Sequence, residues 1–164
     1  MEPELISNES VELDATKIDT FEKVQKFQSF LFQLDGALKG DSPEYLEKCP
    51  LTHKFVDGAY VREIFLPKDT FFVTKIHGKT HPYFVMKGKV KVYIDGNTEI
   101  IEAPFAGITM AGTKRVIYTY EDTVWITVHV TNETDIAKIE DEVIIPESKH
   151  VLHDLNKVSK GELK

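Results

Sequence analysis

Two histidines four residues apart give the clearest chemical signal in the sequence. They are His77 and His81 in the stretch KIHGKTHPYFVMKGKV, residues 75–90, and no carboxylate lies between them. Neutral imidazoles are ligands for zinc, nickel, iron or copper, whereas imidazoles that donate hydrogen bonds beside Lys75 would attract an anion. A third interpretation is a satisfied pair of histidines inside a packed core. The two histidines alone leave all three open.

The residues between the histidines predict a hairpin. A strand that ends at His77 and another that begins near His81 would be joined across Gly-Lys-Thr, and even offsets place both rings on one face. Lys75 has the same parity as His77, and Phe71 and Val73 precede it on that face. We therefore expect a pocket with an apolar floor and a cationic mouth.

Two later segments could add polar groups to this pocket. Arg115 would reach it from the opposite hairpin, and the last strand alternates Trp125, Thr127 and His129 with aliphatic residues. If the face that carries Trp125 is the inner one, His129 becomes a third imidazole of the pocket. The sequence does not fix this parity.

The elements that must position these residues change character along the chain. From Asp19, apolar residues at helical spacing predict an amphipathic helix to about residue 35, with Asp19 and Glu22 as a capping box and Gly36 as the stop. From residue 51, short segments rich in β-branched and aromatic residues alternate with turn signals, which is typical of a sandwich or barrel. A second helix is expected behind a cap at Asn132 or Thr134. The predicted organisation is a tail at 1–18, a helix and connection at 19–50, a barrel at 51–131, a helix at 132–145 and a polar tail at 146–164.

Composition excludes several classes of function. The 164 residues carry a net charge of −7, and 41% of them are hydrophobic. No apolar run approaches the roughly 20 residues that cross a bilayer, and the acidic N-terminus does not resemble a secretion signal, so we expect a cytoplasmic protein with no membrane partner. The negative charge and the lack of a basic cluster argue against nucleic acid as a partner. The single Cys49 excludes an internal disulfide and a cysteine-based zinc cluster.

The strand pattern, the histidine hairpin and a later Ala-Gly-Thr turn resemble the cupin superfamily over roughly residues 51–131. The first cupin motif places two histidines and a glutamate before a glycine, and the matching positions here hold Lys75, His77 and His81. In the second motif, Pro-x-Gly-x-x-His, the matching positions hold Gly112 and, in place of the histidine, Arg115. Two of the four metal-binding positions are therefore occupied by histidine.

The resemblance implies an all-β fold, the double-stranded β-helix or jelly-roll barrel, here with an N-terminal and a C-terminal α-helix. It also implies a homodimer, since cupins similar to this chain often pair through edge strands. The phrases KIHGKTHPYF and AGTKRVIYTYEDTVWITVH look like those of small cupin-domain proteins encoded by bacteriophages, a group that has no established biochemical activity.

A metal site would use His77, His81 and His129, and three imidazoles would leave an open coordination position for a divalent transition metal. Against this, Lys75 and Arg115 would place two permanent positive charges beside the ion, where repulsion in a partly desolvated barrel is costly. A carboxylate ligand is also missing from the motif.

An anion site uses the same cations as attraction. Lys75, His77, His81 and Arg115 could hold a phosphate or carboxylate, and the aromatic rings of Tyr83 and Trp125 could stack on a ring. We therefore predict a binding protein for a small, anionic ligand in the barrel cavity. The alternatives are a metal-dependent isomerase, lyase or oxygenase and a non-catalytic structural or interaction module, so the sequence leaves open whether the protein is an enzyme.

Other polar residues are assigned no part in the site. His53 is expected in the core, and His150 and His153 in a solvated tail. Glu121 and Asp122 are adjacent and would face opposite ways along a strand, so a turn is expected there rather than a catalytic carboxylate pair.

Overall fold

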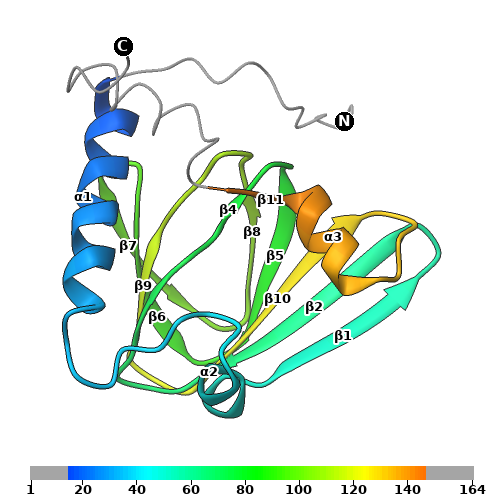
Figure 1. Ribbon diagram of the computed structural model, residues 1–164, viewed down its shortest axis with the longest axis horizontal. Coiled ribbons are helices and arrows are strands. Elements are labelled where there is room, and N and C mark those ends of the chain that lie inside the picture. Colours follow the sequence, from blue (N-terminus) through cyan, green and yellow to red (C-terminus); the bar gives the residue numbers. More distant parts are fainter. Residues whose placement is uncertain (1–14, 147–164) are drawn as a thin grey trace.

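The computed structural model describes residues 15–146, with side chains from residue 19 onward, and it contains two facing antiparallel sheets (Figure 1). The five-stranded sheet has the order β1-β2-β10-β5-β8, formed by Leu51–Val56, Ala59–Leu66, Thr123–Val130, His81–Lys87 and Phe105–Thr109. The four-stranded sheet has the order β3-β9-β6-β7, formed by Phe71–Val73, Val116–Thr119, Lys89–Ile94 and Asn97–Glu102. A short pair joins β4 (Ile76–His77) to β11 (Ile144–Ile145).

This arrangement is a jelly roll because strands that follow each other in the chain are divided between the two sheets. β5 lies in the first sheet, β6 and β7 in the second, β8 in the first, β9 in the second and β10 in the first again. Closure of two sheets in this way protects most strand edges and encloses one core. The mainly β jelly-roll barrel predicted from the sequence is confirmed.

Three helices accompany the barrel: α1 (Ala15–Leu31), α2 (Pro43–Lys48) and α3 (Ile136–Val143). α1 begins and ends four residues earlier than predicted. Asp19 therefore lies inside the helix, where it forms an ion pair with Lys23 at 2.5 Å instead of capping it. α3 is capped by Asp135, whose side chain accepts hydrogen bonds from the backbone N–H groups of Ala137 and Lys138. The predicted cap at Asn132 or Thr134 is therefore wrong by one to three residues.

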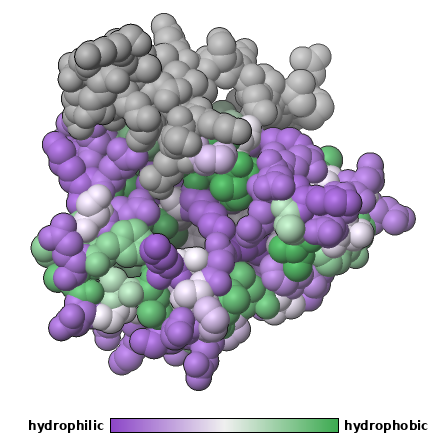
Figure 2. All heavy atoms as spheres, viewed as in Figure 1, coloured by the Kyte–Doolittle hydropathy of each residue, from purple (hydrophilic) through white to green (hydrophobic). Residues whose placement is uncertain are grey.

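The helices cover the barrel from two sides. α1 lies along the four-stranded sheet (Figure 1), where Phe27 contacts Phe71 of β3 with ring centroids 5.3 Å apart. α3 lies across the ends of β2 and β10, where Ile139 and Val143 pack on Tyr60. On the face shown in Figure 2, hydrophilic residues predominate over α1 and α3, and apolar residues form smaller separate patches. None of the helices in the described part of the chain is long and apolar enough to span a membrane.

The main core lies between the two sheets, where alternate residues of each strand point inward. Its buried residues are Cys49, Ile64, Leu66, Tyr83, Val85, Val90, Val92, Ile101, Ile117 and Trp125. The ends of the barrel carry two smaller clusters, one under α1 and one under α3. The polar residues discussed next lie at the end that α3 covers.

Candidate metal and ligand site

The inner face of the five-stranded sheet is set by the alternation of β10. Thr123, Trp125, Thr127 and His129 are buried, and the intervening aliphatic residues are not. The face of Trp125 is therefore the inner one, which settles the parity that the sequence left open. His129 points into the barrel.

Three imidazoles meet at one end of this face. His81 is the first residue of β5, His129 is the last but one of β10, and His77 comes from β4. Their ring centroids are 4.4 Å apart for His81 and His129, 4.6 Å for His77 and His81, and 5.3 Å for His77 and His129. One ring nitrogen from each lies within 4.8 Å of those of the others.

The loop between β4 and β5 carries two of these rings at its ends. β4 pairs with β11, and β5 pairs with β8 and β10, so the predicted hairpin is wrong. The backbone N–H of Gly78 donates to the carbonyl of Val143 at 2.8 Å, and Lys79 forms an ion pair with Glu142 of α3. His81 and His129 are each 3% exposed, and His77 is partly buried. His77 and His81 do lie close together, but a loop between strands of different sheets joins them, and α3 adds cover that the sequence did not predict.

The histidines are held in the neutral form. Burial lowers the pKa of His77 to about 2, with a further contribution from His81 and His129, and it lowers the pKa of His129 to about 4. Burial also lowers the pKa of His81. All three rings are therefore neutral at pH 7, which is the form that binds metal ions.

His81 and His129 each use one ring nitrogen in a hydrogen bond, which leaves the other available as a ligand. His81 Nδ1 lies 3.0 Å from the carbonyl oxygen of Lys79, and because a carbonyl only accepts, this nitrogen is the donor and Nε2 keeps its lone pair. His129 Nε2 lies 3.2 Å from Thr127 Oγ1, whereas His129 Nδ1 is buried with no hydrogen-bond partner among the described residues. A histidine that binds a metal through one ring nitrogen usually donates a hydrogen bond from the other ring N–H to an acceptor of this kind.

Arg115 lies beside the histidine cluster, as the sequence predicted. Its side chain is 4% exposed, and Nη2 donates to Thr109 Oγ1 at 2.7 Å. Its guanidinium lies 5.2 Å from the ring centroid of Tyr83 and 5.9 Å from that of Trp125, and these two rings are stacked at 4.6 Å. Within residues 19–146, Arg115 forms no ion pair. Burial lowers the pKa of this guanidinium, and Tyr83 together with the more distant Asp95 and Glu99 offsets the loss of water only in part.

Lys75 is not part of this cluster, and its predicted place in the pocket is wrong. Its side chain is 42% exposed and forms ion pairs with Asp41 at 2.6 Å and with Glu140 at 3.5 Å. The prediction assumed one strand from residue 71 to 77, but β3 ends at Val73 and β4 begins at Ile76. Lys75 lies in the irregular stretch between these strands, so the alternation of strand faces does not apply to it.

The predicted apolar floor from Phe71 and Val73 is also wrong. Phe71 is exposed and contacts the rings of Phe27 and Tyr118, and Val73 is only partly buried. The residues below the histidines come from the five-stranded sheet instead: Tyr83 and Trp125 lie on its inner face, on the strands that carry His81 and His129.

Two residues near the site were missed by the sequence analysis. Tyr60 is buried next to His129 with ring centroids 6.0 Å apart, and its hydroxyl lies 2.6 Å from Nδ1 of His53, which is partly buried rather than in the core. Arg62 follows on the same face of β2. The period of two in AYVREIFL, with Ile64 buried on this face, could have placed both residues inside.

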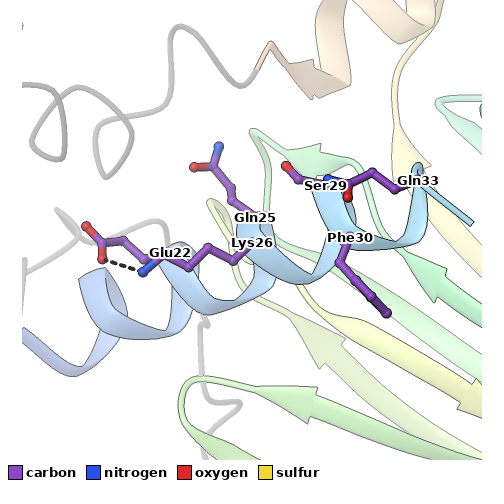
Figure 3. A pocket seen from close by; sticks show the side chains of 6 residues that line it. All are labelled: Glu22, Gln25, Lys26, Ser29, Phe30 and Gln33. Carbon is purple, nitrogen blue, oxygen red and sulfur yellow. Dashed lines mark ion pairs between the residues drawn. The ribbon is translucent and has the colours of Figure 1, made fainter.

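The remaining predicted residues lie away from the cluster. Glu121 and Asp122 form the turn between β9 and β10, where Asp122 accepts a hydrogen bond from the backbone of Lys68 at 3.0 Å. His150 and His153 lie outside the described residues. A depression of about 340 Å³ occurs on the outer face of α1 (Figure 3), and its lining contains no predicted site residue: Glu22, Gln25, Lys26, Ser29, Phe30 and Gln33.

The chain matches no described protein family and no curated protein in sequence. Its structure is similar to the cupin domain of Schizosaccharomyces pombe Cnp3, with 14% identity over 58% of this chain and 71% of that chain and a TM-score of 0.44. It is also similar to ectoine synthase from P. lautus, with 10% identity over 60% of this chain and 75% of that chain and a TM-score of 0.49. For the Clostridium difficile EutQ protein the values are 14% identity, 52% and 70% coverage, and a TM-score of 0.44.

At these identities the similarity concerns the fold alone and gives no activity for this chain. The residues of the site carry the functional argument. The strand order itself shows a jelly-roll fold of two antiparallel sheets around a histidine-bearing interior.

Proposed function

We propose that this chain is a small-molecule-binding cupin that holds a divalent transition-metal ion at His77, His81 and His129. The observation that carries the proposal is the buried Nδ1 of His129, which has no hydrogen-bond partner among the described residues and belongs to a cluster of three neutral imidazoles. A buried polar atom without a partner costs free energy, and coordination of an ion offsets this cost.

The donor set fits zinc, nickel, iron or copper. Imidazole suits these ions, and three protein ligands leave a coordination position for water or a ligand. The three ring nitrogens lie within 4.8 Å of one another, so His77, His81 and His129 could all reach one ion. A bound ion of this kind supplies Lewis acidity toward an oxygen of the ligand.

The same electrostatics oppose a role for these histidines in proton transfer. A general acid or base works best when its pKa is near the working pH, and the pKa values of about 2 for His77 and about 4 for His129 are far below neutrality. The imidazoles therefore serve as ligands in this proposal. The proposal concerns binding of the molecule and includes no chemical step on it.

The ligand is anionic in this proposal, because Arg115 is a buried cation without an ion pair in the described part of the chain. A buried guanidinium without a counter-ion is costly, and a carboxylate or phosphate that forms two parallel hydrogen bonds to it removes the cost. The ligand contacts proposed from the sequence are retained for His77, His81, Tyr83, Arg115 and Trp125. In this proposal the metal ion, and not Lys75, supplies the second positive charge that attracts the ligand.

The test uses the full chain purified without a histidine tag. Elemental analysis of the protein, and titration of the metal-free form with Co²⁺ followed by visible absorption, should show one ion per chain. His81→Gln should weaken Co²⁺ binding by at least about 100-fold, because a ligand is lost outright. His53→Gln is the matched control, since His53 lies on the same sheet outside the cluster, and it should bind Co²⁺ as the native chain does.

Retention of native Co²⁺ affinity by His81→Gln, or the absence of any stoichiometric ion in the native chain, would overturn the proposal. A cupin without an ion and without a ligand would then be a structural or interaction module. Circular dichroism of each variant confirms that the fold is intact.

A further inference from the structure

Arg62 occupies the centre of the inner face of the five-stranded sheet. It pairs in register with His53 of β1 and with Thr127 of β10, and Thr127 in turn pairs with Tyr83 of β5. Because Tyr60, Ile64 and the other residues of this parity in β2 are buried, Arg62 also lies on the inner side. The row of residues that includes Arg62 is therefore next to the row that carries His129 and His81.

The Arg62 guanidinium has no ion pair or hydrogen bond within residues 19–146. The nearest acidic residue along its strand, Glu63, faces outward and pairs with Lys54 at 4.0 Å. The charge of Arg62 nevertheless acts on the cluster, since it contributes to the lowered pKa of His77 and of His129. An arginine that is partly buried and close to neutral histidines is a cation without a counter-ion.

Arg115 approaches the same interior from the other side of β10. It contacts Tyr83 of β5 and Thr109 of β8, whereas Arg62 is on β2. Since β2 and β5 flank β10 (Figure 1) and neighbouring strands are about 4.8 Å apart, the backbones that carry Arg62 and Tyr83 are separated by about 10 Å. Two long side chains can converge across this distance.

The inner face of the sheet contains no acidic residue that could neutralise either arginine. Its inward positions in the five strands are Leu51, His53, Phe55, Tyr60, Arg62, Ile64, Leu66, His81, Tyr83, Val85, Phe105, Gly107, Thr109, Thr123, Trp125, Thr127 and His129. Asp95 and Glu99 influence Arg115 only through longer-range attraction, and both are exposed. With a divalent ion bound, this interior would carry two fixed positive charges in addition to the ion.

We propose that the ligand is a small dicarboxylate, with one carboxylate bound by Arg115 and the other by Arg62 on the opposite side of the metal centre. The inference rests on the proposed function for the position of the ion and adds Arg62 as the residue that selects a second acidic group. Each guanidinium offers a planar fork of donors that matches a carboxylate. The stacked rings of Tyr83 and Trp125 hold Arg115 in place, so less conformational entropy is lost on binding. A monocarboxylate would leave one of the two arginines without a partner.

The test compares acids of equal carbon number by isothermal titration calorimetry of the Co²⁺-loaded protein. Malonate and succinate should bind at least about tenfold more tightly than propionate and butyrate, respectively, because each arginine then gains a carboxylate. Arg62→Met should reduce this ratio to about two or less, with the Co²⁺ content unchanged. Arg62→Lys keeps the charge and should retain part of the preference. Lys54→Met, which removes an exposed cation on the neighbouring strand β1, should leave the ratio as in the native chain.

The outcomes separate this inference from the proposed function. One Co²⁺ per chain together with equal affinity for succinate and butyrate would overturn the dicarboxylate and leave the metal site standing. Native selectivity in Arg62→Met would overturn the role of Arg62. If the chain binds no Co²⁺ but the metal-free protein binds succinate in a manner that Arg62→Met abolishes, the metal site fails and the two-arginine site is supported. Failure of all four acids to bind would overturn the inference.

Discussion

The two inner faces of the barrel have opposite chemistry. The four-stranded sheet turns Val90, Val92, Ile101 and Ile117 inward, and all four are almost completely buried. The five-stranded sheet places histidine, arginine, tyrosine and threonine at the corresponding depth. The four-stranded sheet is thus mainly an apolar wall, whereas the five-stranded sheet combines core residues such as Ile64, Leu66 and Val85 with polar groups that can bind a ligand.

This difference implies a division of labour between stability and binding. Apolar burial in the wall supplies free energy of folding, while the neutral histidines, Arg62 on the facing sheet and Arg115 just before β9 reduce it until a metal or an anion is bound. A rigid support for a functional constellation is what a binding site needs. The two faces should therefore respond differently to substitution, to pH and to loss of surface charge.

Ile117→Ala should have the largest effect on stability. Ile117 is 4% exposed within the main core, and truncation of such a residue costs about 2–5 kcal/mol through lost burial and the cavity that remains. Urea denaturation measures the change in free energy of unfolding. The control is Ile100→Ala on β7 of the same sheet, where the side chain is 61% exposed, and a change within about 0.5 kcal/mol is expected.

Ile117→Ala should leave the Co²⁺ affinity of the folded protein unchanged. A loss of ion binding as large as that of His81→Gln would show that the wall and the site are one cooperative unit, and the division proposed above would be wrong.

The loss of stability at acid pH should be the next largest effect. The unfolded chain protonates His77 near its ordinary pKa of 6.5, whereas the folded chain does so only at about 2. Between these values the unfolded state binds the additional proton, so stability falls as the pH falls below 6.5, and it does not depend on this group above 6.5. At pH 5, this histidine lowers the free energy of unfolding of the metal-free protein by about 2 kcal/mol relative to pH 7.

Replacement of His77 by glutamine should therefore reduce the difference in unfolding free energy between pH 7 and pH 5 by about 2 kcal/mol. Urea titrations of the metal-free native and variant chains at the two pH values measure it. Identical acid limbs for the two proteins would show that His77 is exposed to protons in the folded state, and the neutral cluster would not stand.

The sequence predicted the barrel because local signals determine it. Alternating β-branched residues and glycine turns mark the strands. The proximity of His77 and His81 was expected from a hairpin, but the structure produces it by a loop between strands of different sheets. The position of His129 could not be predicted, because it depends on which face of β10 is buried. Only the packing of the two sheets determines that face. The buried face is set by tertiary contacts, so the sequence of a single strand does not reveal it.

The errors in the predicted site also have a physical cause. Lys75 was placed by counting through a strand that the structure interrupts between Val73 and Ile76, and alternation of faces holds only within a continuous strand. Arg62 was omitted because a charged residue in a strand is most simply assigned to solvent. Its inward position follows from the register with Thr127, which is a long-range contact.

Substitution of Lys75 should have the smallest effect on stability. Because Lys75 belongs to neither inner face, it also serves as a control for the comparison of the two sheets. Its ion pairs with Asp41 and Glu140 join the connection before α2 to α3 at a surface where both partners are exposed, and such pairs contribute about 0–1 kcal/mol. Lys75→Met should therefore lower the free energy of unfolding by no more than about 1 kcal/mol, and added salt should reduce the difference because exposed charges are screened. Co²⁺ affinity and the preference for succinate over butyrate should be native. If Lys75→Met instead abolished succinate binding at unchanged stability, the anion would be bound at the cationic mouth that the sequence predicted, and the two arginines on the inner side would be structural.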